Sequence, residues 1–108
     1  MNQQDKIELS KRVAEKLGID ASISNTYEDR YLENGHYQYE EVTNTTWLAD
    51  DDARCFRLMI DYGITLNGSF CGRFIYANNP DNEIDITEFT DVYEATRIAI
   101  LKCLENME

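Results

Sequence analysis

Proline, glycine and cysteine are scarce in this 108-residue chain, which has one proline, five glycines and three cysteines. So little proline and glycine excludes a fibrous or low-complexity protein. Cys55, Cys71 and Cys103 are isolated from one another and have no C-x-x-C spacing. An odd number of cysteines at such spacing predicts buried free thiols rather than disulfides or a zinc site.

Long apolar runs are also missing. No run approaches the ~20 apolar residues that a membrane span needs, and residues 1–6 lack the apolar core of a secretory signal. We therefore expect a cytoplasmic protein that does not associate with a membrane. A chain of 108 residues is long enough for one hydrophobic core, so we expect a single domain over residues 1–108.

Basic residues are outnumbered, with 10 Lys and Arg against 21 Asp and Glu, which gives a formal net charge of −11. Residues 1–20 are neutral, so the whole net charge lies in residues 21–108. An acidic field repels nucleic-acid phosphates and attracts basic partners. The sequence therefore predicts no direct nucleic-acid binding.

The first predicted helix spans residues 3–17, and Gly18 follows it as a C-terminal stop. Its apolar stripe is thin, so residues 1–20 are expected to dock loosely. The stripe consists of Ile7, Ser10, Ala14 and Leu17, with Val13 beside it.

Two Asn-Gly pairs, Asn34-Gly35 and Asn67-Gly68, predict two-residue hairpin turns because both positions tolerate a positive φ. The second hairpin carries apolar residues on both faces, which is typical of a sheet covered on both sides. The strands are expected at residues 28–33 and 36–42 in the first hairpin and at residues 64–66 and 70–76 in the second.

Two further helices are indicated. The acidic triplet Asp50–Asp52 predicts a helix start, and the helix should end at Gly63. The last helix, at about residues 90–105, is the most apolar and is expected to be central to the core; Asp91 and Glu94 have the spacing of a capping box. The earlier helix is expected to pack by a stripe of Ala49, Ala53, Phe56 and Ile60, which Cys55 and Met59 widen.

The predicted order is helix, hairpin, helix, hairpin, helix. It indicates an α+β fold with a mostly antiparallel sheet covered by helices, as an α/β/α sandwich.

No motif for catalysis, phosphate binding or metal binding is complete. Residues 81–92 place acidic groups as a calcium loop does but have Ile86 and Val92 where glycine and glutamate are needed. His36, the only histidine, has no recognisable nucleophile near it in sequence, and helix capping accounts for Asp50–Asp52. We therefore predict no catalytic residues, no metal and no cofactor.

The candidate binding surface combines carboxylates with aromatic side chains. In one interpretation it contacts a basic partner protein through aromatic anchors; in the other the tyrosines pack on a sheet and the acids keep the protein soluble. The candidate partner-binding residues are Tyr37, Tyr39, Trp47, Asp81, Glu83 and Asp85.

Three segments together resemble a known family. They are Thr46–Asp50 ahead of a helix, a glycine-bearing hairpin with a Phe/Tyr strand, and Ala95–Leu101 in the last helix. The pattern, over residues 42–106, resembles small phage and prophage proteins called the phage ABA sandwich domain. This resemblance implies a helix, sheet, helix layering and a phage origin, and it implies no catalytic residue.

These observations predict a non-enzymatic phage accessory protein that acts by binding a basic host protein, as an inhibitor of a nucleic-acid-binding defence protein. The alternatives are a protein that sequesters a nucleotide by stacking it on Trp47 and tyrosines, and a small enzyme. Homo-oligomerisation stays open.

Overall fold

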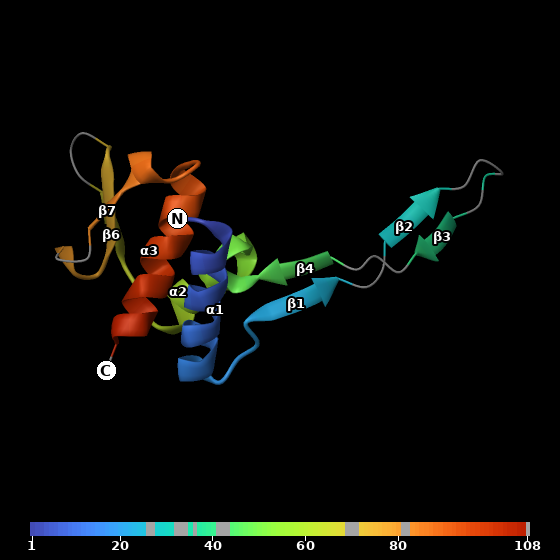
Figure 1. Ribbon diagram of the computed structural model, residues 1–108, viewed down its shortest axis with the longest axis horizontal. Helices are drawn as coiled ribbons and strands as arrows, with labels where there is room; N and C mark the ends of the chain where they lie inside the picture. Colours follow the sequence, from blue (N-terminus) through green and yellow to red (C-terminus); the bar gives the residue numbers. More distant parts are fainter. Residues whose placement is uncertain are drawn as a thin grey trace.

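The computed structural model describes residues 1–107 except 26–27, 32–34, 36, 41–43, 69–71 and 81–82 (Figure 1). Its three α-helices are α1 (Gln3–Leu17), α2 (Asp52–Asp61) and α3 (Val92–Asn106). The described strands all pair in antiparallel ladders. The predicted α+β class is therefore confirmed.

The helices begin and end where the sequence predicts. α1 ends at Gly18, whose φ of 68° lies in the left-handed region that favours glycine. The Asp51 carboxylate accepts a hydrogen bond from the backbone N–H of Arg54 at 3.1 Å. Asp91 accepts one from the backbone N–H of Glu94 at 2.8 Å. The two carboxylate caps predicted for α2 and α3 are thus confirmed.

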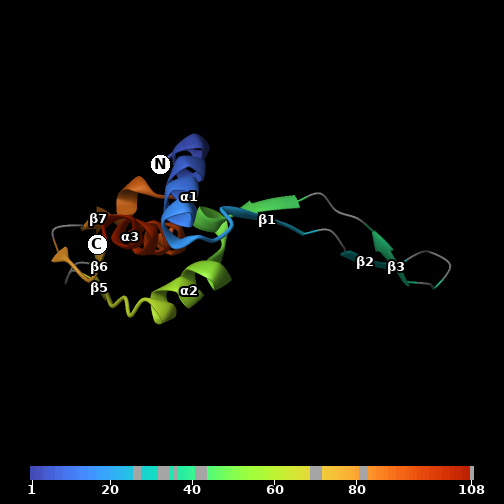
Figure 2. The same cartoon turned by 90° about the horizontal axis from the view of Figure 1, so that it is seen from below.

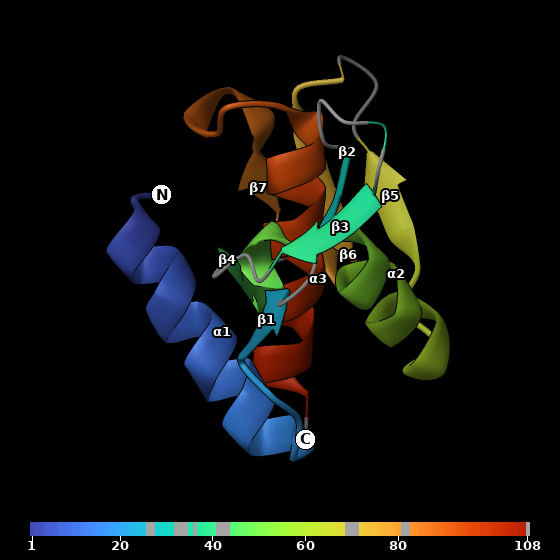
Figure 3. The ribbon, with the colours of Figure 1, turned by 90° about the vertical axis from the view of Figure 1, so that its right-hand side faces the viewer.

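α3 is the central helix of the core, as predicted. Figure 3 shows α1 and α2 on either side of it, and β6 of the sheet packs against it from another direction (Figure 1). Burial on several faces requires small or apolar side chains all round the helix. The buried residues of α3 are Glu94, Ala95, Ile98, Ala99, Ile100, Leu101, Cys103 and Leu104.

α1 is an integral part of this core. Leu9 and Val13 are fully buried, so the packed face is wider than the predicted stripe, which omitted Leu9. The hydroxyl of buried Ser10 donates to the carbonyl of Lys6 at 2.8 Å and accepts from the backbone N–H of Ala49 at 3.0 Å. That second bond ties α1 to the short 3₁₀-helix η1 (Leu48–Asp50).

A cluster of ion pairs also connects α1 to η1 and α3. Lys6 Nζ is 3.0 Å from Asp50 Oδ1 and 3.5 Å from Glu94 Oε2, and its side chain is 12% exposed. It joins α1, η1 and α3. In the predicted capping box, the Glu94 carboxylate would accept a hydrogen bond from the backbone N–H of Asp91. It pairs with Lys6 instead.

A three-stranded sheet consists of β5 (Leu66–Gly68), β6 (Phe74–Ala77) and β7 (Ile84–Asp85), in that order. Leu66 pairs with Ala77 and Gly68 pairs with Ile75. The prediction of a turn at Asn67-Gly68 is wrong because both residues belong to β5, and the reversal falls later, before β6. Phe70 and Cys71 lie outside the described residues.

The remaining strands form an extension that we call the arm, Ser22–Trp47. β1 (Ser22–Asn25) pairs with β4 (Asn44–Trp47) next to the body, and β2 (Glu28–Tyr31) pairs with β3 (Tyr37–Glu40) beyond them. The arm projects along the longest axis of the molecule (Figures 1 and 2). A backbone hydrogen bond from Leu48 to Ala21, at 2.9 Å, continues the ladder into the body.

The register at the end of the arm also differs from prediction. A two-residue turn at Asn34-Gly35 would pair Tyr31 with Gln38, but Tyr31 pairs with Tyr37. The register of the two strands is thus shifted by one residue from the expected one, while Asn34 and His36, which flank Gly35, lie outside the described residues. Gly35 takes a φ of 83°, so the requirement for glycine at this position holds.

The packing face of α2 differs from the predicted stripe. Cys55 and Leu58 are buried, whereas Phe56 is 59% exposed and Ile60 is 62% exposed. The prediction that Phe56 and Ile60 face the core is wrong.

The predicted α/β/α sandwich is not confirmed. In the described residues α1, α2 and the sheet each pack against a different face of α3, so the sheet is not enclosed between two layers of helices (Figures 1 and 3). A third strand, β7, also extends the second hairpin.

Candidate functional site

The six candidate partner-binding residues do not form one surface. Tyr37 and Tyr39 belong to β3, far out on the arm, whereas Asp85 belongs to β7 at the opposite end of the molecule (Figure 1). Glu83 is exposed just before β7, and Asp81 lies outside the described residues. The predicted surface is therefore divided between two ends of a molecule 57 Å long.

Asp85 is structurally engaged rather than part of a free acidic loop. One oxygen accepts hydrogen bonds from Nε and Nη2 of Arg73 at 3.2 and 2.8 Å, and the other accepts from the Thr87 hydroxyl at 2.6 Å. Thr87 belongs to the 3₁₀-helix η3 (Ile86–Glu88), and Asp85 caps this helix by accepting a hydrogen bond from the Thr87 backbone N–H at 3.0 Å. Arg73 and Thr87 hold the pKa of the Asp85 carboxyl at about 2, below its usual 3.8. Asp85, a candidate partner-binding residue, is therefore engaged within the fold by Arg73 and Thr87.

Trp47 lies at the base of the arm. It is the last residue of β4, is half-buried, and pairs with Ser22 in the ladder. The Lys11 ammonium of α1 lies 5.6 Å from the centre of the Trp47 ring. This cation–π contact links the arm to α1, which makes Trp47 an anchor for the arm.

The arm has its own composition. Residues 22–47 contain five acidic residues and one basic residue, Arg30, and four of the seven tyrosines of the chain. In the ladder, Tyr31 pairs with Tyr37 and Asp29 pairs with Tyr39. Carboxylates and tyrosines thus occupy neighbouring register positions in this ladder.

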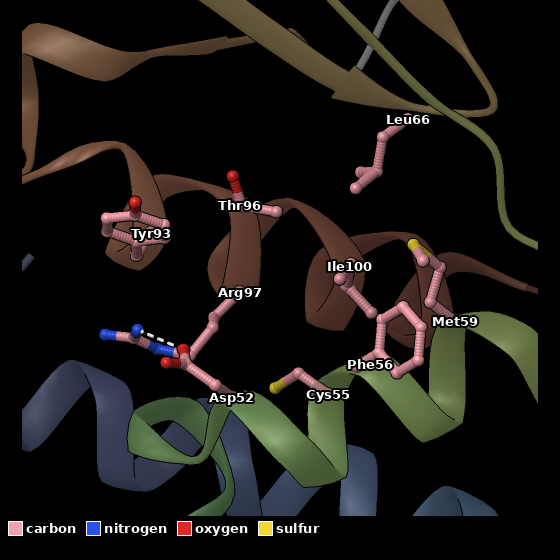
Figure 4. A pocket seen from close by; sticks show the side chains of 9 residues that line it. All are labelled: Asp52, Cys55, Phe56, Met59, Leu66, Tyr93, Thr96, Arg97 and Ile100. Carbon is pink, nitrogen blue, oxygen red and sulfur yellow. Dashed lines mark hydrogen bonds and ion pairs between the residues drawn. The ribbon is translucent and has the colours of Figure 1, made fainter.

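An apolar groove lies between α2, β5 and α3 (Figure 4). Its volume is about 270 Å³, and its rim includes the exposed rings of Phe56 and Tyr93, the latter 67% exposed. The sequence pattern did not indicate this groove, because it placed Phe56 in the core. The lining residues are Asp52, Cys55, Phe56, Met59, Leu66, Tyr93, Thr96, Arg97 and Ile100.

The polar end of the groove is an ion pair of the fold. Arg97 Nη1 donates to Asp52 Oδ1 at 2.7 Å (Figure 4). Arg97 Nε donates to the carbonyl of Ala49 at 2.8 Å. The Arg97 side chain is 15% exposed and joins α3 to the start of α2. Arg97 is therefore occupied in holding the two helices together.

The described thiols are buried and free, as predicted for Cys55 and Cys103. Burial raises the pKa of the Cys55 thiol to about 12 from its usual 9.0, and burial also raises the pKa of Cys103. Cys55 Sγ donates to the carbonyl of Leu48 at 3.2 Å. These thiols are consequently protonated at neutral pH, which makes them poor nucleophiles.

Within the described part of the chain, no group of three or more His, Cys, Asp or Glu side chains is arranged to hold a metal ion. Among the same residues, no helix has the length and apolar character to cross a membrane.

Comparison with protein-family models, curated proteins and solved structures found no match for this chain. The resemblance to the phage ABA sandwich domain stays a prediction.

Proposed function

We propose that this protein acts by binding, without catalysis, and that the arm is its contact element for a basic surface of another protein. The observation that carries the proposal is the projection of an acidic, tyrosine-rich pair of strands away from the body (Figure 2). Exposed tyrosines are common anchors in protein interfaces, and acidic rims accelerate association with basic partners.

The charges of the body support this interpretation. Lys6, Arg12, Arg73 and Arg97 each form an ion pair with a carboxylate of the same chain. These cations are used by the fold, whereas the arm has a sequence net charge of −4. A basic partner is therefore attracted to the arm over distances of about one Debye length, ~8–10 Å at physiological salt.

Charge density argues against literal imitation of duplex DNA. A duplex as long as the 57 Å axis of this molecule carries about 34 phosphate charges, at one per ~1.7 Å. The chain carries a net −11, about a third of that value. In the phage setting that the resemblance implies, we propose that the protein covers part of a nucleic-acid-binding surface of a host defence protein in the cytoplasm, with tyrosine contacts adding to charge.

The geometry gives less support to stacking of one nucleotide between Trp47 and the arm tyrosines. Trp47 is the last residue of β4, next to the body, whereas Tyr37 belongs to β3, farther out on the arm (Figure 1). The two strands follow one another along the arm, which does not favour the stacking of one base on both residues.

The test compares two variants that each lose four carboxylates. The arm variant is Glu28→Gln, Asp29→Asn, Glu40→Gln and Glu41→Gln; the control variant is Glu8→Gln, Glu15→Gln, Asp61→Asn and Glu88→Gln, all exposed positions of the body. A partner captured from host lysate is measured by surface plasmon resonance at low and physiological salt. We expect the arm variant to associate at least about tenfold more slowly and with a flatter salt dependence. Equal slowing in both folded variants would refute a role for the arm.

A further inference from the structure

A second hollow lies where the arm meets α2. Its volume is about 270 Å³, and it is bounded by the segment after α1, by β1 and by one side of α2. It is separate from the groove in Figure 4, since the two share no lining residue. The lining residues are Ile19, Ile23, Arg54, Arg57 and Leu58.

The two arginines of this hollow, Arg54 and Arg57, form no ion pair among the described residues. Arg54 Nη2 donates to the backbone carbonyl of Asp20, and its Nη1 is buried without a hydrogen-bond partner among the described residues. Arg57 is exposed and has neither an ion pair nor a hydrogen bond in the described structure. They stand three residues apart on α2, so their side chains leave the same face of the helix.

An unpaired pair of cations is unexpected in a chain with a net charge of −11, where carboxylates outnumber basic side chains two to one. A buried guanidinium nitrogen without an acceptor costs free energy, because its hydration has been lost and not replaced. A ligand oxygen that accepts a hydrogen bond from Arg54 Nη1, after the guanidinium turns toward it, would remove that cost. Guanidinium groups bind planar carboxylates through paired hydrogen bonds.

The rest of the hollow is aliphatic. Ile19 is 38% exposed, Ile23 is 45% exposed, and Leu58 is buried at the base with 8% exposure. Exposed isoleucines beside a cavity offer apolar area that a ligand can remove from water. Phosphate or sulfate alone would leave this area uncovered.

We propose that this hollow binds a small organic acid, with its carboxylate between Arg54 and Arg57 and its alkyl body against Ile19, Ile23 and Leu58. The site is independent of the proposed function of the arm, since it uses cations of the body and a ligand of the opposite charge. Its volume, near the lower end of the range for ligand pockets, suits a short acyl chain rather than a cofactor.

The test uses hexanoate as the probe, with hexanol and inorganic phosphate as comparisons. In the full chain with labelled isoleucine methyl groups, we expect hexanoate to shift the Ile19 and Ile23 resonances saturably and to half-saturate at about tenfold lower concentration than hexanol. A tenfold ratio corresponds to about one hydrogen bond to a charged group. Comparable half-saturation by hexanol would overturn the role of the arginines, and phosphate competing as well as hexanoate would overturn the role of the apolar wall.

Variants separate the site from the general charge of the protein. Arg57→Gln should abolish the preference for hexanoate over hexanol, because it removes one of the two guanidinium groups of the hollow at an exposed position without a hydrogen bond or ion pair among the described residues. Lys102→Gln makes the same change in net charge outside the hollow and should leave the preference intact. Ile23→Ser should weaken hexanoate and hexanol alike. Equal losses in Arg57→Gln and Lys102→Gln would overturn the proposal.

Discussion

Leu9 on α1 gives the sharpest test of the core. Its side chain is fully buried, although the sequence pattern had left it outside the apolar stripe. Replacing it with alanine removes three methyl or methylene-sized groups from a close-packed site and leaves a cavity. Such substitutions cost about 2–5 kcal/mol, and full burial at the junction of α1 with the core favours the middle of that range. A domain of this size has a total stability of only about 5–15 kcal/mol.

The assay is urea unfolding followed by circular dichroism. With a slope of about 1–3 kcal/mol per molar urea, the midpoint of Leu9→Ala should fall by roughly 1–3 M. Ile7→Ala serves as the matched control, because Ile7 lies on the same helix but is only half-buried, and it should cost distinctly less. A loss below about 1 kcal/mol for Leu9→Ala, or equal losses for the two variants, would mean that α1 is not part of the core.

Two further predictions concern Asp85 and Cys55. Because the folded pKa of Asp85 is lowered to about 2 from 3.8, its charged form stabilises the fold above about pH 4, and this contribution is lost as the pH falls toward 2. Urea melts of Asp85→Asn should therefore differ most from the parent above pH ~4 and converge near pH ~2; a difference independent of pH would contradict the Arg73 pairing. Cys55, with a pKa of about 12, should resist alkylation by iodoacetamide near pH 8 in the folded protein and should react in urea. Peptide mass spectrometry measures the extent of alkylation, and rapid alkylation of the folded protein would show that Cys55 is not buried.

The helix ends and the central position of α3 were predictable from sequence because they depend on local chemistry. Carboxylates at Asp51 and Asp91 cap free backbone N–H groups within three residues, and Gly18 supplies a left-handed residue. Such signals do not require knowledge of the tertiary fold. The apolar face of α3 is so broad that the sequence alone predicts burial of this helix on more than one side.

Strand register and the choice of packing face were not predictable in the same way. An Asn-Gly pair permits a turn but does not require one, so Asn67 and Gly68 extend β5 when pairing with β6 is more favourable. On α2, a stripe through Phe56 and one through Cys55 and Leu58 are both apolar, and only the position of α3 and η1 selects the second.

The composition of the candidate surfaces was predictable from the sequence, whereas their position in the fold was not. The acidic and aromatic composition of the arm could be read from residues 22–47, but its projection from the body could not. The Arg54 and Arg57 hollow escaped detection because its walls come from three segments whose proximity depends on the fold. A useful signal was present all the same, since two arginines one helical turn apart are rare in so acidic a chain.

The position of α3 in the chain has a consequence for biosynthesis. The helix against which α1, α2 and the sheet pack follows all of them in the sequence. On a translating ribosome, Leu9 is made some 95 residues before Leu104, an interval of roughly 5–20 seconds at bacterial and eukaryotic elongation rates. During that time the apolar faces of α1 and η1 have no completed core to join. Nascent chains of this protein should therefore recruit holding chaperones until α3 emerges, and truncation before Val92 should yield an insoluble product rather than a smaller folded domain.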